Sequence, residues 1–158
     1  MTDFNAIREI VGTATYAQVM GDTSGAIDWL KAQSFVNDDA IGITGFCWGG
    51  RQTNALAVAA GGDVLAAAPY YGSQPPAADV PKIKARMMLH YAENDANINK
   101  GIAAYEDALK KAGTKFEMFT YPGTQHAFNN DGSAARYNKA AADLAWKRTV
   151  DMFKKELA

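Results

Sequence analysis

The chain has 158 residues, of which 48% are hydrophobic and 21% are charged, and its formal net charge is −1. This near-neutral charge, without any run of basic residues, gives no support for a nucleic-acid or membrane partner. The single cysteine excludes an intrachain disulfide and a multi-cysteine zinc site. The first residues contain no apolar core of signal-peptide length. We therefore expect a soluble, cytoplasmic protein in which residues 1–158 form one domain.

Strand-like and helix-like segments alternate along the chain. Short apolar or alternating runs predict four strands, at residues 40–44, 64–68, 85–90 and 115–121. Helical spacing of apolar residues predicts about five helices, at 4–14, 16–31, 48–60, roughly 102–113, and the C-terminal segment. This order is typical of an α/β fold with a mostly parallel sheet of about four strands flanked by helices.

Some finer features can be predicted from single residues. Pro69 is expected to end the second strand, because proline has no backbone N–H to donate. Trp29, Trp146 and the pair Met87-Met88 are expected in the core. The buried face of the last helix is predicted from helical spacing, with the members Ala142, Trp146, Val150, Phe153 and Leu157.

The segment Gly45-Phe46-Cys47-Trp48-Gly49 lies between a predicted strand and a predicted helix. A G-x-nucleophile-x-G turn in this context is the nucleophile elbow of α/β-hydrolases, here with a thiol in place of the usual hydroxyl. The glycines allow the strand and the helix to approach closely. A lone cysteine is more often a small buried apolar residue. The position of Cys47 at a helix N-terminus, which favours the thiolate, instead indicates a nucleophile.

An acid and a histidine follow the third and fourth predicted strands. The resulting order of nucleophile, acid and histidine is that of α/β-hydrolases. Asp95 comes after the strand at 85–90, and His126 comes after the strand at 115–121. The carboxyl ends of parallel strands share one edge of the sheet, so both side chains can reach Cys47. Glu93 competes with Asp95 for the role of the acid. Asp95 is preferred because it lies deeper in its loop.

The second histidine, His90, lies inside a predicted strand, where a buried structural role is expected. A metal site formed by His90, Glu93, Asp95 and His126 is conceivable. Their spacing, however, matches none of the usual helical or zinc-finger ligand patterns. We therefore expect neither a metal nor another cofactor.

The sequence resembles the dienelactone hydrolase family (carboxymethylenebutenolidases) from about residue 14 onward. Three segments carry the resemblance: the elbow with Gly50, Tyr70-Tyr71-Gly72, and Gly123-Thr124-Gln125-His126-Ala127-Phe128. It implies an α/β-hydrolase fold, a Cys47-Asp95-His126 triad, no cofactor, and a small lactone or ester as substrate. It also implies that the Trp48 backbone N–H is an oxyanion donor and that Tyr71 and Phe128 belong to the substrate site.

The chain departs from the family pattern on its N-terminal side. Family members carry further strands there, which hold a second oxyanion donor, a glutamate near the resting thiol and an arginine for the substrate carboxylate. None of these has a counterpart here, and the second arginine of the family, four residues after the histidine, is Asn130. The dienelactone substrate itself is therefore in question. The runner-up hypotheses are a degenerate domain that binds a ligand without turnover and an acyl transferase with the same triad.

The shortened chain leaves the strand at 40–44 without a neighbour on one side. An apolar edge of this kind is normally paired or covered. A second copy of the chain, the helices at 4–14 and 16–31, or the rest of a longer hydrolase can provide the cover. The first option predicts a homodimer.

Overall fold

The computed structural model describes residues 4–158, and its centre is a parallel sheet of four strands in the order β1-β2-β3-β4. The strands are β1 (Gly42–Phe46), β2 (Ala66–Tyr70), β3 (Arg86–Asn94) and β4 (Phe116–Gln125). Each strand pairs in parallel with the next one along the chain. The predicted α/β class and number of strands are therefore confirmed.

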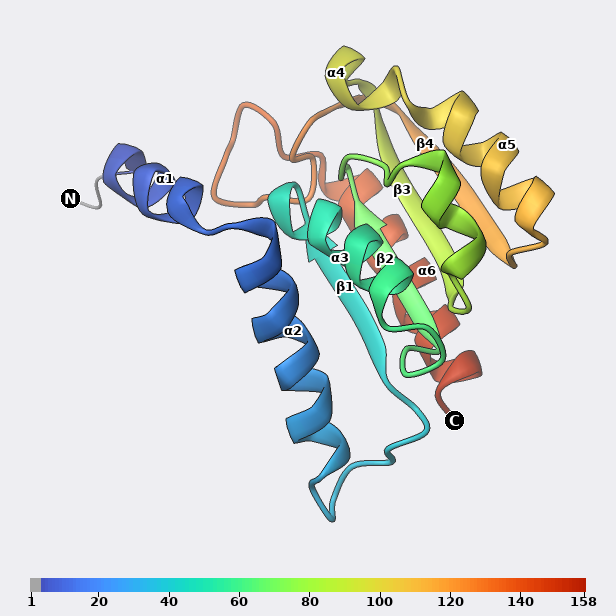
Figure 1. Cartoon of the computed structure of the whole chain (residues 1–158). Coiled ribbons are helices and arrows are strands. Elements are labelled where there is room, and N and C mark those ends of the chain that lie inside the picture. Colours follow the sequence, from blue (N-terminus) through green and yellow to red (C-terminus); the bar gives the residue numbers. More distant parts are fainter. Residues whose placement is uncertain (1–3) are drawn as a thin grey trace.

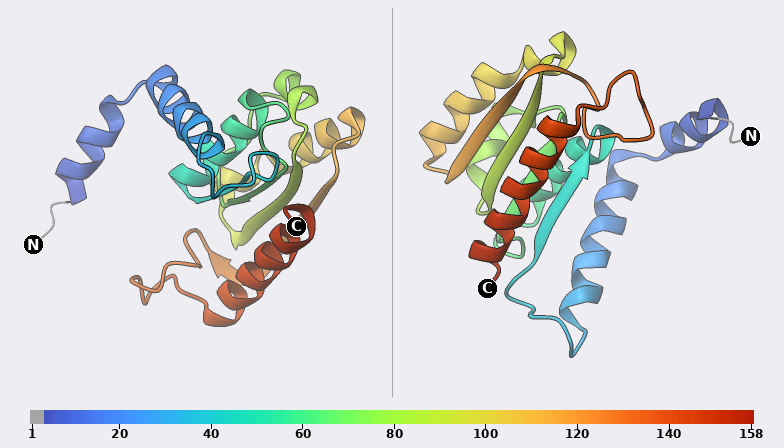
Figure 2. Two further views of the ribbon diagram at one scale, coloured as in Figure 1. Left: turned by 90° about the horizontal axis from the view of Figure 1, so that it is seen from below. Right: turned by 180° about the vertical axis from the view of Figure 1, so that it is seen from behind.

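Helices cover both faces of this sheet (Figure 1). The α-helices are α1 (Phe4–Thr13), α2 (Tyr16–Lys31), α3 (Trp48–Ala59), α4 (Ala96–Asn99), α5 (Ile102–Ala112) and α6 (Lys139–Glu156). A 3-10 helix, η1 (Ala77–Lys82), lies in the connection between β2 and β3. Figure 2 shows α6 alone on the face of the sheet opposite α3 and α5, while α1 projects away from the body.

Two apolar cores fill the spaces between these layers. On one face, Leu56 of α3 and Leu109 of α5 pack against Met87 and Leu89 of β3. On the other face, side chains of α6 pack against Met88 and the aromatic residues of β2 and β4. The Met87-Met88 pair is buried, as predicted, and its two side chains serve opposite faces because side chains alternate along a strand.

Pro69 does not end β2, contrary to the prediction. The strand continues to Tyr70, and Pro69 pairs with Gly45 of β1. On the β3 side the paired positions are Ala66, Ala67 and Tyr70, so the ladder is interrupted at Ala68 and Pro69. The missing N–H thus removes one ladder contact locally without breaking the strand.

The two tryptophans expected in the core are exposed. Trp29 is 59% exposed on α2, and Trp146 is 48% exposed on α6. The buried face of α6 is rotated from the predicted one and consists of Ala141, Ala142, Ala145, Thr149 and Met152. Small residues on this face let the helix lie close to the sheet, which places the bulky indole of Trp146 at the flank.

The free edge of β1 is only partly covered. Helix α2 packs against α3 through Ile27 and Leu30, but a hollow of about 720 Å³ remains between α1, α2, β1 and α3. Its lining is mostly apolar and includes Val11, Ile41 and Ile43. The N-terminal helices therefore do not close this edge. Within residues 4–158, none of the helices combines the length and the apolar character needed to cross a membrane.

Candidate active site

The turn between β1 and α3 holds Cys47 in a backbone conformation that side chains rarely adopt. Its φ is 55° and its ψ is −112°. The Cys47 N–H donates a hydrogen bond to the carbonyl oxygen of Tyr70 at 3.0 Å, and its carbonyl accepts from the Arg51 N–H, which starts α3. The thiol is thereby left exposed at the N-terminus of α3, at the carboxyl edge of the sheet.

Two glycines make this turn possible by close packing. A Cβ atom on Gly45 would lie 2.4 Å from the carbonyl oxygen of Gly49, and one on Gly50 would lie 2.4 Å from the carbonyl oxygen of Tyr70. Gly72 is equally tight, since its Cβ would lie 2.2 Å from the carbonyl carbon of Gly50. Gly49 itself has open space around it. The steric requirement expected at Gly49 thus falls on Gly50 and Gly72 instead.

Asp95 and His126 meet Cys47 at this edge, although they come from different strands. The His126 Nε2 lies 3.0 Å from the Cys47 Sγ, and its Nδ1 lies 2.5 Å from the Asp95 Oδ2. Asp95 is only 8% exposed, and its other carboxylate oxygen accepts the Ile98 N–H at the start of α4. The carboxylate is therefore fixed on both sides and holds the imidazole ring with Nε2 toward the thiol.

Glu93, the competing acid, lies elsewhere. Its carboxylate accepts a hydrogen bond from the Gly123 N–H at 2.8 Å and holds the start of the turn before His126. The structure therefore places Asp95, and not Glu93, on the histidine. Among the described residues, no group of three or more histidine, cysteine and acidic side chains is arranged to hold a metal ion.

A hollow of about 310 Å³ opens beside Cys47. It is lined by Phe46, Cys47, Tyr71, Ala127, Asn129, Asn130 and Asp131. Three of these, Cys47, Tyr71 and Ala127, are the non-glycine residues with positive φ in the described chain. Backbone strain of this kind persists only where the surroundings enforce it and is concentrated at functional sites. Asn129 and Asp131 were not among the predicted site residues, although the turn-forming run after His126 indicates a loop over the site.

The other predicted site residues take different positions. Trp48 is the first residue of α3, so its backbone N–H has no partner within the helix, and the residue also lines the hollow beside β1. Tyr71 is a wall of the hollow, with its ring 5.0 Å from that of His126. Phe128 is fully buried against Tyr71 and Tyr121. Phe128 therefore does not line the hollow beside Cys47, because the chain turns inward after Ala127.

A model of the dienelactone hydrolase family matches residues 2–157 of the chain. The chain belongs to this family. It is 32% identical to a carboxymethylenebutenolidase homologue of Methylorubrum extorquens, over 94% of this chain and 54% of that protein. It is 29% identical to a homologue from Escherichia coli K12, over 92% of this chain and 56% of that protein.

The fold of the family is also seen in solved structures. The crystal structure of a dienelactone hydrolase homologue from Klebsiella pneumoniae matches with a TM-score of 0.85 and 28% sequence identity, over 98% of this chain and 68% of that one. The present chain spans about half the length of the curated relatives it matches. Its four strands are thus part of an α/β-hydrolase fold.

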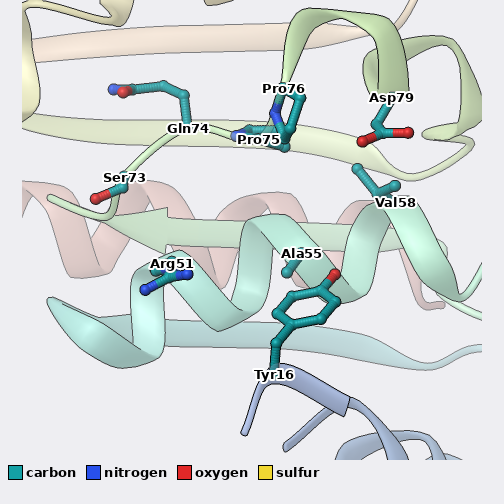
Figure 3. Close-up of a pocket in the computed structure, with 9 residues that line it drawn as sticks. All are labelled: Tyr16, Arg51, Ala55, Val58, Ser73, Gln74, Pro75, Pro76 and Asp79. Carbon is teal, nitrogen blue, oxygen red and sulfur yellow. The ribbon is translucent and has the colours of Figure 1, made fainter. Parts of the chain in front are cut away.

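A third hollow of this dienelactone hydrolase family member lies along α3, between Tyr16 of α2 and the segment from Ser73 to Asp79 (Figure 3). It measures about 330 Å³ and is lined by Tyr16, Arg51, Ala55, Val58, Ser73, Gln74, Pro75, Pro76 and Asp79. Neither Cys47, Asp95 nor His126 belongs to its lining. Arg51 therefore serves a different surface from the one on which the thiol opens.

The remaining histidine, His90, is fully buried, as predicted. Its ring nitrogens form hydrogen bonds with the Tyr121 hydroxyl at 2.8 Å and the Thr149 hydroxyl at 3.0 Å, and its ring stacks on Tyr70. Burial, with a smaller contribution from the positive charge of Arg148, lowers the pKa of His90 from 6.5 to about 3. His90 is thus neutral and joins β2, β3, β4 and α6 in one polar network.

This burial predicts acid sensitivity. Because the pKa of His90 is lower in the folded state than in the unfolded state, the unfolded chain binds more protons below pH 6.5. The free energy of unfolding should therefore fall as the pH drops below 6.5, by up to about 1.4 kcal/mol per pH unit from this group. Urea unfolding at pH 7 and pH 5.5 should show a smaller loss for His90→Gln than for the wild type. Equal losses would mean that His90 is protonated in the folded protein.

Proposed function

We propose that this chain hydrolyses small lactones or activated carboxylic esters through a Cys47-Asp95-His126 triad. The observation that carries the proposal is the continuous hydrogen-bonded line from the Asp95 carboxylate through the His126 ring to the Cys47 thiol, 2.5 Å and 3.0 Å long in its two steps. A nucleophile, a base and an orienting group within hydrogen-bond reach are the arrangement needed for covalent catalysis. The relatives named as carboxymethylenebutenolidase homologues support the same reaction class.

In the first half of the reaction the thiol is acylated. His126 takes the Cys47 proton at Nε2, and the sulfur attacks the carbonyl carbon of the substrate. The negative charge on the carbonyl oxygen is stabilised by the Trp48 N–H at the start of α3. As the bond to the alcohol breaks, His126 returns the proton from Nε2 to the leaving oxygen. The product is a thioester on Cys47 and a free alcohol, or a ring-opened hydroxyacyl chain from a lactone.

In the second half of the reaction the thioester is hydrolysed. His126, neutral again, removes a proton from water, and the resulting hydroxide attacks the thioester carbonyl. The tetrahedral intermediate collapses with release of the Cys47 sulfur, which regains the proton from His126. Asp95 stabilises the positive imidazole ring in both halves and keeps the proton on Nδ1.

The site has fewer oxyanion donors than acyl-transfer enzymes usually have, and this favours one alternative function. The Trp48 N–H is one donor, whereas the developing charge in acyl transfer is usually met by at least two. A missing donor lowers the rate on the order of 10²–10³-fold. A domain that binds a lactone or ester without efficient turnover is therefore the second candidate.

The test compares the wild type with Cys47→Ala on p-nitrophenyl acetate. We expect slow but saturable turnover by the wild type and only background hydrolysis by the variant, since the alanine leaves no nucleophile. Equal rates for the two proteins would contradict the proposal. Saturable ester binding without any Cys47-dependent rate would support the alternative function.

We also propose that two copies associate along β1. Its free edge and the apolar hollow of about 720 Å³ beside it offer an unpaired strand and an uncovered surface. Light scattering at micromolar concentration should give twice the 17.0 kDa of one chain. Val11→Lys should weaken association, because Val11 lines this hollow, while Leu65→Lys, which is equally exposed at 40% on another surface, should not. A monomeric wild type would overturn the proposal.

A further inference from the structure

The hollow beside Cys47 is acidic in character. Asp131 is its one charged lining residue apart from the reacting groups, and it is exposed. Asn129 and Asn130 are its uncharged polar residues, and its described lining contains neither lysine nor arginine. The Asp95 carboxylate, directly after β3, adds a negative charge on the far side of His126 at the same edge of the sheet. A bound substrate therefore meets negative charge without a fixed counter-ion.

The basic residues that lie nearest in the chain face other surfaces. Arg51 lines the hollow between Tyr16 and the segment from Ser73 to Asp79 (Figure 3). Arg148 of α6 lies over the Phe119 ring at 3.8 Å and donates to the Tyr121 hydroxyl. Arg136, the one basic residue of the segment 127–138, is exposed and does not line the hollow. None of these three basic residues therefore lines the hollow beside Cys47.

The two asparagines of the hollow each carry an amide oxygen and an amide NH₂ group, and one of the two oxygens has no hydrogen-bond partner among the described residues. The Oδ1 atom of Asn129 is buried and has no hydrogen-bond partner among the described residues. The Asn130 Oδ1 is occupied by the Gly132 N–H at 3.1 Å. An unpaired buried acceptor is unfavourable until a donor reaches it. A cationic group can pair with the exposed Asp131, whereas a carboxylate is repelled by it.

We infer that this site accepts esters or lactones whose acyl part is uncharged or cationic and discriminates against those that carry a carboxylate. The inference rests on the proposed hydrolase function. Negative charge in the site repels a substrate carboxylate when no cation is present to pair with it. The same negative charge raises the local concentration of cationic substrates. Substrate charge is thus selected by the loop after His126, through Asp131 above all.

Three p-nitrophenyl esters with one leaving group test this selection: the hexanoate, the adipate half ester, and the 6-(trimethylammonio)hexanoate. After subtraction of the Cys47→Ala background, kcat/KM should be about tenfold lower for the adipate half ester than for the other two, since screened charges contribute effects of this order. The difference should shrink in 0.5 M NaCl. A higher kcat/KM for the adipate half ester than for the other two esters would overturn the inference.

Variants locate the effect in the loop. Asp131→Asn should reduce the discrimination against the adipate half ester, and Asn130→Arg should reduce it further or reverse it. Asp151→Asn is the matched control, because it changes the net charge equally but lies near Arg86 at the opposite end of the sheet. It should leave the order of the three esters unchanged. Discrimination that is unaffected by Asp131→Asn, or equally altered by Asp151→Asn, would contradict the role of the loop.

Failure of the hydrolase proposal can be told apart from failure of this inference. If none of the esters shows Cys47-dependent turnover, the proposed function fails. Protection of Cys47 against iodoacetamide by the three corresponding amides then tests the same charge order without catalysis. Weaker protection by the adipate half amide than by the other two would support the inference, and stronger protection would overturn it.

Discussion

Replacing His126 with alanine should lower the Cys47-dependent kcat/KM about 10³-fold, because the base that accepts the thiol proton is lost. Adding Asp95→Asn to this variant should lower the rate by less than about threefold more, since residues that act as a unit give non-additive losses. Asp95→Asn alone should be strongly impaired. The asparagine amide would have to donate a hydrogen bond to the His126 Nδ1, so the ring proton would move to Nε2. A protonated Nε2 cannot accept the proton of the thiol.

The asparagine at position 95 retains the oxygen that caps α4 by accepting the Ile98 N–H, so the local fold should persist. Glu93→Gln is the matched control, because Glu93 bonds the Gly123 N–H and not the histidine. It should stay within about threefold of wild-type activity, as expected for a group outside the unit. If the rate loss of the double variant equalled the product of the two single losses, the residues would act independently, which would contradict the coupled triad. An active Asp95→Asn with an inactive Glu93→Gln would show that Glu93 is the acid.

The second large effect is expected at Gly50. A Cβ there would lie 2.4 Å from the Tyr70 carbonyl oxygen and 3.2 Å from the Gly45 carbonyl oxygen, both of which are backbone atoms that cannot move aside easily. Gly50→Ala should therefore push α3 away from β1 and β2, with a loss of about 1–3 kcal/mol in the free energy of unfolding. Because Cys47 lies at the junction of β1 and α3, turnover should fall as well.

Gly49→Ala is the matched control for this substitution. The two residues are neighbours in the same helix, but a Cβ on Gly49 meets nothing within 4 Å. Urea unfolding should show unchanged or slightly higher stability, since alanine favours helix over glycine by up to about 1 kcal/mol. Equal destabilisation of the two variants would mean that helix geometry, and not the contact with β2, limits the elbow.

The parts of this fold that follow from local pattern could be predicted from the sequence. Four apolar or alternating runs gave the four strands, and the strand-turn-helix order placed Cys47 at the elbow. The strand ends were predicted too early. β3 continues to Asn94 and β4 to Gln125, directly before Asp95 and His126, and the last residues of both strands are mostly exposed and polar rather than core residues. An apolar pattern therefore ends before the strand does at such an edge.

The other differences arise from tertiary packing. Helical spacing allows either Ala145 or Trp146 to follow Ala142 on the buried face of α6, and only the close approach of the helix to the sheet selects the alanine. The triad order suggested Asp95 and His126, but their contact with each other and with Cys47 depends on the relative positions of three strands. The lining residues Asn129 and Asp131 belong to a loop without periodicity, so no pattern assigned them.

The most direct test of a cysteine-based hydrolase is the identity of the acylated residue during turnover. Intact-mass and peptide measurements on rapidly quenched mixtures with p-nitrophenyl acetate should show one acetyl group on Cys47, which disappears as the ester is consumed. The adduct should be absent from Cys47→Ala, and it should hydrolyse more slowly when it is formed in His126→Ala, because the base that activates water is missing. Turnover without acetylated Cys47, or acetylation confined to lysines, would contradict the account.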